Sequence, residues 1–541
     1  MTSRQRRRQE KRRRHSDRGR LPNRRQIATG TGMTVGATLL IGGTAQAATF
    51  TVDSLADPSD PGHTTLRDAL NNAETPANAG STITFASGLS GTIHLGSQLP
   101  PINEPTTIQG PGAGQLAISG DDSTRLMYIG GGTDRFPVTI SGVTLTHGLA
   151  QSPPGPRNGG AIFLDGADLT VADSILSGNR ALGSDPTDGY GGGICICYDL
   201  GNLTVRNSTF TGNLAGGSGG AIYDDDSPVT ITGSTFSGNQ AYYRGGAASF
   251  SSTYPPGVAI QNSTFTGNRQ TATGGADYGG GAIFSYEPVT ITSSTVAGNS
   301  ASRGGGVNLD STVTPPDVLR NTIVANNTAS EAGPDLLGSF DSAFSLVRDT
   351  AGASINQTVP GSNVFAVDPQ LSGLASNGGS TQTMKPALTS PAIDKGTAFG
   401  LTTDQRGSTR PVDISTIPNS VAPGADGSDI GAYELPSNVF KIKKVKDRKL
   451  VLKLPSAGEV QVTDAKSKKR SAGATVSKSK KSLKPSQKSG GPGKLKVKLR
   501  LTKAAAKKLR RLGKLKLKAA ITFSPTGGWP ATKKAKLKLK Q

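Results

Sequence analysis

Between Gly159 and Asn327 the chain repeats one pattern of apolar and polar positions six times. Each copy opens with a glycine pair and a small or branched apolar residue, continues with alternating apolar and polar residues, and ends in Asn. In the clearest copy Gly219–Ile222 is followed by Val229–Thr232 and then by Phe236–Asn239. Such alternation is typical of strands that are buried on one face. Each copy therefore predicts three short strands.

The closing asparagines recur every 26 to 34 residues, a period typical of solenoids and propellers. The copies lack the 3.6-residue apolar stripe of helical repeats, and a propeller blade needs about 40 residues. We therefore expect an all-β fold, a right-handed parallel β-helix in which like residues stack from coil to coil. One such ladder should contain Ile162, Ile194, Ile222, Ile283 and Val307.

The closing asparagines have a structural explanation. Asn tolerates the left-handed conformation found at corners, and a stacked column of Asn can satisfy its own amide groups. Glycine pairs serve the other corners for the same conformational reason. The predicted structural ladder contains Asn179, Asn213, Asn239, Asn268, Asn299 and Asn327.

Three stretches resemble known families of secreted β-helix proteins. Gly-Gly-Ala-Ile paired with Phe-x-x-Asn, as in Phe210–Asn213, Phe236–Asn239 and Phe265–Asn268, resembles the repeat of chlamydial polymorphic outer membrane proteins, which are surface β-helical passengers. Thr64–Leu70 is similar to the CSLREA motif at the start of bacterial secreted β-helix proteins, although it lacks the Cys and has Asp68 in place of Glu.

The third stretch, Asp368–Glu434, resembles the choice-of-anchor Q segment that ends such proteins. The matching pieces begin at Asp368 (Asp-Pro-Gln-Leu), Ser390 (Ser-Pro-Ala-Ile-Asp), Asp404 (Asp-Gln-Arg-Gly) and Asp429 (Asp-Ile-Gly-Ala-Tyr-Glu). Together these resemblances imply a pectin lyase-like solenoid that is extracellular or displayed on a bacterial cell surface. They imply no reaction, because function resides in sites and not in the fold.

Charge divides the chain into three unlike parts. Residues 1–25 contain 12 basic and 2 acidic side chains, residues 26–440 contain 15 and 33, and residues 441–541 contain 33 and 3. The net charges are therefore +10, −18 and +30. An acidic solenoid is followed by a very basic tail, which the overall net charge of +22 conceals.

The first basic block has the order of an export signal. Arg4–Arg25 precedes an apolar run of about 15 residues and then Ala45–Ala47, a small-x-small pattern that predicts cleavage before Ala48. A bilayer span needs about 20 residues, so we expect no transmembrane span in the mature chain. The predicted location is secreted, extracellular and associated with the cell surface. Arg24–Ile27 leaves both the general and the twin-arginine export routes open.

Five regions follow from these patterns. Residues 1–47 form a signal peptide with a long basic leader, residues 48–147 an N-terminal cap with irregular first coils, and residues 148–366 the regular coils. Residues 367–435 form the segment expected to close the other end of the solenoid, because solenoid ends need covers. Residues 436–541 form a separate Lys-rich module.

The basic tail also has a strand pattern. Charged and apolar residues alternate in Lys494–Leu501, Lys514–Lys518 and Lys534–Lys540, so each stretch can bury one face and solvate the other. Residues 466–493 are expected to be a flexible Ser/Lys/Gly interruption. We predict a small β-sandwich-like module, which resembles the lysine-rich C-terminal modules of secreted actinobacterial proteins.

Outside a cell, so basic a module attracts polyanions such as anionic cell-envelope or extracellular polymers, polysaccharide among them. The aromatic candidates beside the basic strands are Trp529 and Phe523, too few for specific single-stranded nucleic-acid recognition. A purely solvated charge run, or docking onto the acidic solenoid, stays open as an alternative. The predicted polyanion-binding residues are Lys494, Lys496, Lys498, Arg500, Lys514, Lys516 and Lys518.

Pectate lyases and polygalacturonases share the β-helix architecture, so a carbohydrate-active enzyme that cleaves acidic polysaccharide is the alternative function. Its candidate catalytic residues are Asp165, Asp225 and Asp310, each three positions after a ladder residue. Asp is also common where strands end, and the hydrolase signature of paired Asp with Gly-His-Gly and Arg-x-Lys is absent from the sequence. We therefore expect an adhesin-like binding or structural role.

Two smaller features bear on cofactors. Asp224, Asp225 and Asp226 offer oxygen ligands in a row and are a candidate Ca²⁺ site, and no other cofactor is expected. Cys195 and Cys197 are the two cysteines, at i and i+2 of one strand. Because a bridge within one strand is strained, we expect two small buried apolar side chains there.

Overall fold

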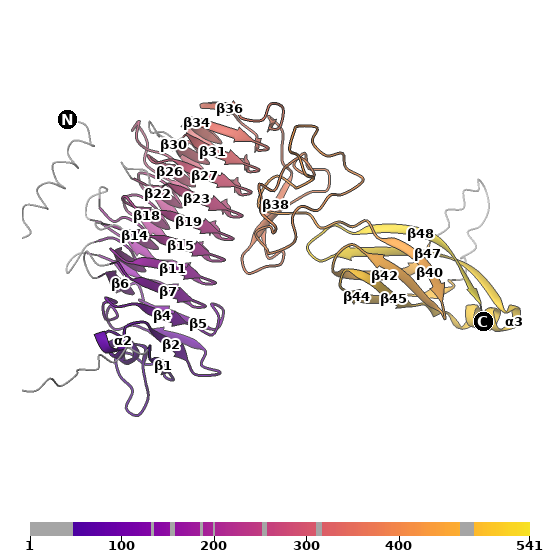
Figure 1. Ribbon diagram of the computed structural model, residues 1–541, viewed down its shortest axis with the longest axis horizontal. Coiled ribbons are helices and arrows are strands. Elements are labelled where there is room, and N and C mark those ends of the chain that lie inside the picture. The colour runs from indigo at the N-terminus through magenta and orange to yellow at the C-terminus, as the bar shows by residue number, and fades with distance from the viewer. Residues whose placement is uncertain are drawn as a thin grey trace, which may run out of the picture. The chain divides into compact units, whose positions relative to one another are not determined.

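A computed structural model shows a β-helix followed by an irregular segment and a β-sandwich module (Figure 1). The predicted leader lies outside the described residues except for Ala47. Neither α-helix in the described part is long and apolar enough to cross a lipid bilayer. The described residues are 47–130, 135–151, 157–183, 188–197, 201–251, 257–309, 316–465 and 481–540.

The middle of the chain is a parallel β-helix, which confirms the predicted fold class. Each strand pairs in parallel with its counterpart one coil later, as in Ile222–Asp224 with Ala248–Phe250. The structure adds a fourth strand to the three that the pattern predicts. It has only two residues in most coils, as in Gln240–Ala241, and follows directly on the closing Asn. Such a short segment carries too few alternating positions to be recognised in the sequence.

The strands of the β-helix form four runs, of which the first two join through β34 into one 19-stranded sheet. The Ile222 run contains β6 (Met127–Gly130), β10 (Ile162–Asp165), β14 (Ile194–Ile196), β18 (Ile222–Asp224), β22 (Ala248–Phe250), β26 (Ile283–Ser285) and β30 (Val307–Leu309). The Val229 run contains β1 (Thr49–Val52), β2 (Ser81–Phe85), β4 (Thr106–Gln109), β7 (Pro137–Ser141), β11 (Asp168–Ala172), β15 (Leu203–Arg206), β19 (Val229–Thr232), β23 (Val258–Gln261), β27 (Val289–Thr292), β31 (Asp317–Arg320), β34 (Leu336–Ala343) and β36 (Ala353–Gln357).

The other two runs form an 11-stranded and a 7-stranded sheet. The Phe236 run contains β3 (Gly91–His94), β5 (Leu116–Ser119), β8 (Thr144–Thr146), β12 (Ile175–Ser177), β16 (Thr209–Thr211), β20 (Thr235–Ser237), β24 (Thr264–Thr266), β28 (Thr295–Ala297), β32 (Ile323–Ala325), β35 (Leu346–Val347) and β37 (Val364–Phe365). The Gln240 run contains β9 (Leu149–Ala150), β13 (Arg180–Ala181), β17 (Leu214–Ala215), β21 (Gln240–Ala241), β25 (Arg269–Gln270), β29 (Ser300–Arg303) and β33 (Thr328–Ala332).

The interior of the coils is a stack of like residues. Ile162, Ile194 and Ile222 are in register, Ala248 takes the next place, and Ile283 and Val307 follow. All of them are fully buried in one hydrophobic core. Burial of such side chains stabilises a fold by about 1.5–3 kcal/mol each, so the ladder holds neighbouring coils together.

The first coil is covered by α2 (Leu66–Ala73), within the region 48–147 expected to contain an N-terminal cap. Thr65 caps it, and the Asp68 side chain accepts a hydrogen bond from the Thr65 backbone, so both halves of a capping box are present. Leu66, Ala69 and Leu70 turn inward and join the core of the β-helix. A 3₁₀ turn, Pro76–Asn78, follows the helix.

Residues 367–435 were expected to close the end of the solenoid. In the structure they pack against the flank of the β-helix, along several coils. Thr381 Oγ1 donates to Gly233 O (2.8 Å), Asn262 Nδ2 to Thr403 O (2.9 Å), and Ala432 N to Thr295 Oγ1 (3.1 Å). These partners belong to successive coils. The segment is mostly irregular, with one antiparallel pair formed by β38 (Leu371–Ala375) and β39 (Thr383–Pro386).

The C-terminal module contains two antiparallel sheets whose inward side chains form one core. That core contains Leu450 and Leu452 of one sheet and Leu517 and Phe523 of the other, so the sheets pack face to face. The three-stranded sheet contains β40 (Lys441–Lys446), β41 (Lys449–Leu454) and β45 (Gly493–Lys498). The four-stranded sheet contains β44 (Ser486–Gly490), β42 (Gly458–Asp464), β47 (Lys514–Pro525) and β48 (Ala531–Lys540).

Two small elements complete the module. The strands β43 (Leu483–Lys484) and β46 (Arg500–Leu501) pair with each other, and α3 (Lys503–Leu512) follows. The expectation of a flexible interruption over residues 466–493 is wrong for its second part, because β43 and β44 lie there. The reason is pairing: Ser486–Gly490 is polar, but its backbone hydrogen-bonds along β42. Residues 466–480 lie outside the described part of the chain.

Candidate functional site: two lysine faces on the C-terminal module

Lysines cover the outward face of the three-stranded sheet, which we call the β41 face. Pairing aligns Lys441, Lys453 and Lys494 in one row across the three strands. A second row consists of Lys446, Lys449 and Lys498. Between them, Val451 lies opposite Lys444 on one side and Lys496 on the other. Eight exposed lysines therefore surround one valine, which is only 4% exposed.

The four-stranded sheet carries a second lysine array, the β47 face. Lys514 lies directly opposite Lys540, Lys516 opposite Lys538, and Lys518 opposite Lys536. Lys534 extends the array by one position, opposite Ala520. Leu515 and Leu517 alternate with these lysines and point into the core. Because side chains alternate across a strand, the alternation that builds the core also brings these seven lysines to the same outward face.

Both arrays place like charges next to one another. Neighbouring strands are about 4.8 Å apart, and alternate residues along one strand are about 6.7 Å apart. Both spacings are below the Debye length of about 8–10 Å, so the ammonium groups repel each other. Like charges directly opposite on paired strands cost up to about 1 kcal/mol per pair. The β41 face has four such pairs and the β47 face has three.

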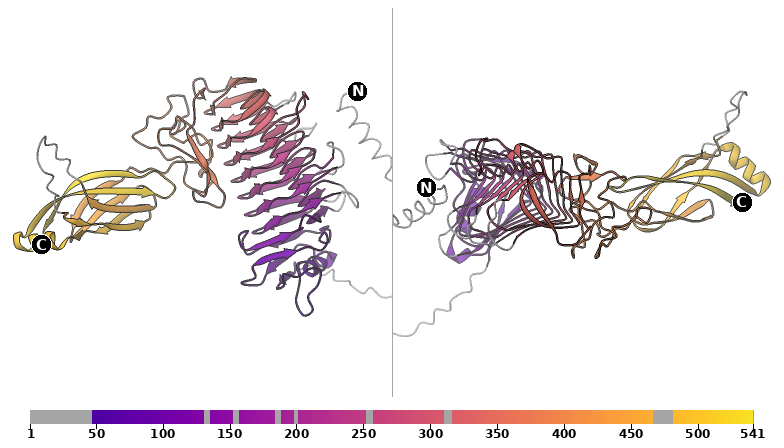
Figure 2. Two further views of the ribbon diagram at one scale, coloured as in Figure 1. Left: turned by 180° about the vertical axis from the view of Figure 1, so that it is seen from behind. Right: turned by 90° about the horizontal axis from the view of Figure 1, so that it is seen from above.

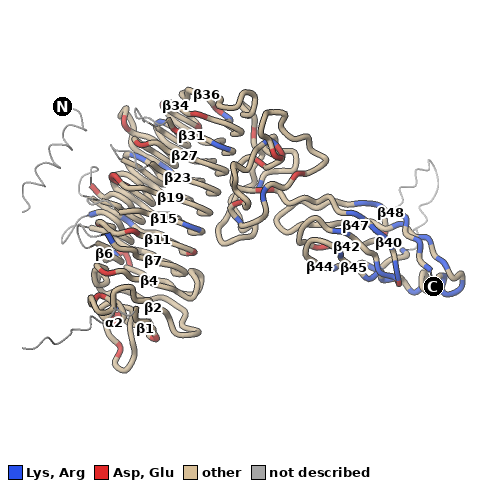
Figure 3. The backbone as a smooth tube through the Cα atoms, viewed as in Figure 1, with Lys and Arg blue, Asp and Glu red and all other residues tan. Residues whose placement is uncertain are grey.

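The acidic residues of the module do not offset this charge. Asp464 Oδ2 accepts hydrogen bonds from the backbone N–H groups of Ser482 and Leu483, and Glu459 Oε2 accepts one from Gln487 Nε2. None of the ion pairs between described residues includes a lysine of either face. Figure 3 shows the contrast, with blue gathered on the strands of the module. The arrangement suits a ligand that brings its own closely spaced negative charges.

The structure divides the predicted polyanion-binding residues between two surfaces. Lys494, Lys496 and Lys498 lie on the β41 face, whereas Lys514, Lys516 and Lys518 lie on the β47 face. Arg500 is exposed but belongs to neither array, because its strand β46 pairs with β43. Sequence reasoning missed the contribution of β40 and β41, whose lysines complete the three rows of the β41 face. Their alternation is interrupted by a β-bulge between Ile442 and Lys444.

The two aromatic residues considered for base stacking are both engaged elsewhere. Phe523 is fully buried in the core of the module. Trp529 Nε1 donates a hydrogen bond to Pro386 O at 3.0 Å, and Lys385 Nζ lies 4.3 Å from the centre of its ring. Neither ring can serve as an open stacking platform for a nucleobase while these contacts last.

The candidate catalytic carboxylates follow the strands of the Ile222 run. Asp165 ends β10, and its Oδ2 accepts a hydrogen bond from the Tyr128 hydroxyl at 2.8 Å. Asp225 follows β18, two coils later, so the backbones of the two residues are about 9.6 Å apart at about 4.8 Å per coil. The intervening coil places Cys197 in the same column. Asp310 lies outside the described residues.

Asp224 turns into the interior of the solenoid and not toward its two acidic neighbours. It stacks between Ile196 and Phe250 and is fully buried. Burial, together with the negative charge of Glu287, raises the pKa of Asp224 well above its usual value. Among the described residues, no group of three or more His, Cys, Asp or Glu side chains is arranged to hold a metal ion.

Cys195 and Cys197, expected to be separate thiols, are joined by a disulfide. Both are buried on the outward side of β14, in a cluster with Phe163 and Tyr223. Their positions at i and i+2 put both side chains on the same side of the strand, which allows the sulfur atoms to meet.

A histidine-containing depression on the Phe236 run was missed by sequence reasoning. It has a volume of about 380 Å³ and is lined by residues that include His94, Asp121, Asp122 and His147. His94 Nδ1 lies 2.9 Å from Asp121 Oδ2. A hydrogen bond from Ser119, with a further contribution from His94, lowers the pKa of Asp121. The available signal was the near-coil spacing of His94, Asp121 and His147, which lie outside the six clear repeats.

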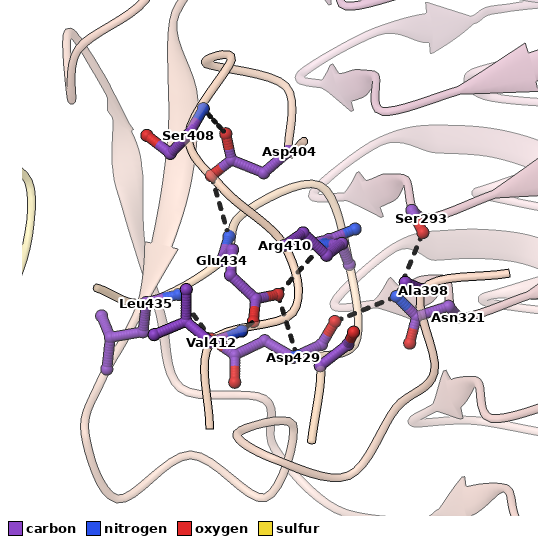
Figure 4. Close-up of polar contacts among 12 residues, drawn as sticks. Ser293, Asn321, Ala398, Asp404, Ser408, Arg410, Val412, Asp429, Glu434 and Leu435 are labelled. Carbon is purple, nitrogen blue, oxygen red and sulfur yellow. Dashed lines mark hydrogen bonds and ion pairs between the residues drawn. The ribbon is translucent and has the colours of Figure 1, made fainter. Parts of the chain in front are cut away.

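Buried ionic groups organise the 367–435 segment (Figure 4). Arg410 Nε and Glu434 Oε2 are 2.9 Å apart, and both side chains are fully buried. The same Glu434 accepts hydrogen bonds from the backbone N–H groups of Val412 and Asp429. Burial raises the pKa of Glu434 to about 7, against the opposing effect of Arg410. Asn321 Nδ2, on the solenoid, donates to Asp429 O at 3.0 Å, so this network fastens the segment to the coils.

Comparison with known proteins supports the fold. Residues 192–358 match the family described as right handed beta helix region. No curated protein matches the sequence. Among solved structures, the PL6 family alginate lyase AlyGC is similar at 12% sequence identity with a TM-score of 0.23, over 70% of this chain and 60% of that one. The chain therefore spans less than two thirds of that protein. The family match supports a right-handed β-helix over residues 192–358.

Proposed function

We propose that this protein is a secreted or surface-associated β-helix with an adhesin-like, binding or structural role, attached to anionic polymers of the cell envelope by its C-terminal module. The observation that carries the proposal is the alignment of lysines in the two faces, with seven like-charged pairs directly opposite each other. The core fixes this register, but it does not require lysine at the outward positions, where neutral polar residues would avoid the repulsion. A bound polyanion neutralises the aligned lysines and so relieves their mutual repulsion. This relief contributes favourably to the binding free energy.

Two features of the sequence support the location. The leader has the order of an export signal, and the repeat, Thr64–Leu70 and Asp368–Glu434 resemble the polymorphic outer membrane protein, CSLREA and choice-of-anchor Q patterns of exported proteins. The solenoid then presents its coils and loops to its surroundings, as repeat proteins do in binding roles. Among the described residues, the candidate carboxylates Asp165 and Asp225 are about two coil spacings apart, and this spacing does not by itself favour catalysis over binding.

The test measures retention of the full chain on isolated cell walls as a function of salt. The variant carries Lys494→Gln, Lys496→Gln and Lys498→Gln on the β41 face. Its matched control carries Lys503→Gln, Lys507→Gln and Lys508→Gln, which remove the same charge from exposed positions of α3. Each phosphate neutralised contributes about −0.7 to the slope of log K against log salt for a flexible strand.

Loss of three lysine contacts should therefore make the salt slope shallower by about 2, whereas the α3 control should change it much less. Equal effects of the two triple variants would show that binding follows net charge and not the arrayed lysines. Retention of the wild type that does not depend on salt would remove the proposal altogether.

A further inference from the structure

The module presents its two lysine faces in opposite directions. Leu450, Leu452 and Leu495 behind the β41 face and Leu515 and Leu517 behind the β47 face belong to a single hydrophobic core. The two sheets therefore face each other through their apolar sides, about 10 Å apart. Because side chains alternate across a strand, the lysines of each sheet point away from that shared core. One polymer segment lying along one face cannot also cover the other.

Each face is also complete by itself. The β41 face offers eight lysines from three strands, and the β47 face offers seven from two strands. The β41 face extends over three rows and the β47 face over four, so each can contact several successive charges of a linear chain. The two faces have no residue in common. The number of charges is enough for salt-dependent binding at either face alone.

From this we infer that the C-terminal module is bivalent: it bridges two segments of a linear, phosphate-bearing polymer and so cross-links the polymer to which it binds. The inference rests on the proposed polyanion binding and adds its valency and ligand class. Two binding faces on one rigid core convert the second contact into an intramolecular one, which strengthens attachment to a dense polymer layer without a new contact type.

The side chains at the two faces suit closely spaced phosphate groups. Apart from Val451, the three aligned rows of the β41 face consist of lysines, and the β47 face adds lysines beside Ala520. Lysine is a frequent phosphate ligand that acts as a point charge, whereas the planar fork of arginine binds carboxylates and phosphates in a bidentate way. Rows of lysine therefore suit a ligand recognised by the spacing of its charges along the chain. The residues aligned in these rows include no aromatic ring, which stacking on nucleobases requires.

Cross-linking is tested with the full chain and long-chain polyphosphate at low salt, with light scattering as the readout. Binding is measured separately, by retention on immobilised polyphosphate. One variant carries Lys494→Gln, Lys496→Gln and Lys498→Gln. The second carries Lys514→Gln, Lys516→Gln and Lys518→Gln. The α3 triple variant is the control for loss of three charges, and all chains carry the same leader.

The wild type and the α3 control should bind polyphosphate and raise its scattering at least tenfold above that of the polymer alone. Each single-face variant should still be retained but should lose most of the scattering, and a mixture of the two should not restore it. Melting curves check that the variants are folded, which is expected because the substitutions are exposed and relieve repulsion.

The outcomes separate the two proposals. Retention of the wild type without scattering, or undiminished scattering by both single-face variants, would overturn bivalency and leave the polyanion binding intact. Absence of retention would overturn both. Scattering that is stronger with polygalacturonate, duplex DNA or anionic vesicles than with polyphosphate would overturn the phosphate-polymer assignment.

Discussion

Replacing Asn239 by Ala tests the asparagine column that joins neighbouring coils. Asn239 Nδ2 donates to Phe210 O at 3.0 Å and to Asn268 Oδ1 at 2.8 Å. Its Oδ1 accepts from Asn213 N at 3.0 Å and from Asn213 Nδ2 at 2.9 Å. The side chain is fully buried, so water cannot replace these partners. One substitution therefore removes hydrogen bonds to the coils before and after it.

The expected cost follows from these four bonds. At about 1 kcal/mol net for each buried hydrogen bond, Asn239→Ala should lower the free energy of opening by about 4 kcal/mol. The largest local change is expected at the backbone N–H of Asn213, because this group loses its hydrogen-bond acceptor. Its amide hydrogen should exchange roughly a thousandfold faster, since about 1.4 kcal/mol corresponds to a factor of ten.

Amide hydrogen exchange of the full chain is the appropriate assay, because solenoids can open locally before they unfold globally. Asn239→Asp keeps the volume but cannot donate as the amide does, so it separates lost hydrogen bonds from a cavity effect. Asn72→Ala, at an exposed position of α2, is the control and should change little. If the amide hydrogen of Asn213 exchanges as slowly in both Asn239 variants as in the wild type, the asparagine column does not stabilise the contact between coils.

Two further predictions concern the coils. Gly220→Ala should lower the free energy of unfolding by more than about 3 kcal/mol, because the added Cβ would lie 2.1 Å from Gly246 O. Gly238→Ala has φ +63° but no atom within 4 Å of the added Cβ, so it should lower that free energy by only about 1–2 kcal/mol. Denaturant unfolding measures both values. Equal costs would contradict this steric account. Burial raises the pKa of Asp317 to about 7, so the folded state keeps a proton that the unfolded chain releases above pH about 4. Stability should therefore fall as pH rises toward and through 7, and Asp317→Asn should flatten that fall; an unchanged pH profile would refute the assignment.

The coil was the most predictable feature. Its apolar ladder and asparagine column recur at one position per copy, and a residue in a parallel solenoid contacts mainly its own counterparts in the next coil. Sequence spacing therefore translates directly into contact, as in Ile194 against Ile222. The fourth strand was not predicted because a two-residue segment is too short to show alternation of apolar and polar positions.

The flank contacts of the 367–435 segment were less predictable for a different reason. Gln405 hydrogen-bonds Thr235 and Thr264, which precede it by 170 and 141 residues. No periodicity relates these positions, because the segment is irregular and contacts the coils through individual side chains. A pattern can identify the segment but cannot say which coils receive it.

Local alternation and composition were enough to predict the winding of the solenoid and the concentration of positive charge in residues 441–541. The arrangement of those charges follows from three-dimensional packing. Pairing of β41 with β45, and of β47 with β48, aligns lysines into rows, and a shared core turns the rows to opposite sides. Strand register depends on non-local packing of apolar side chains, which charge and spacing alone do not specify.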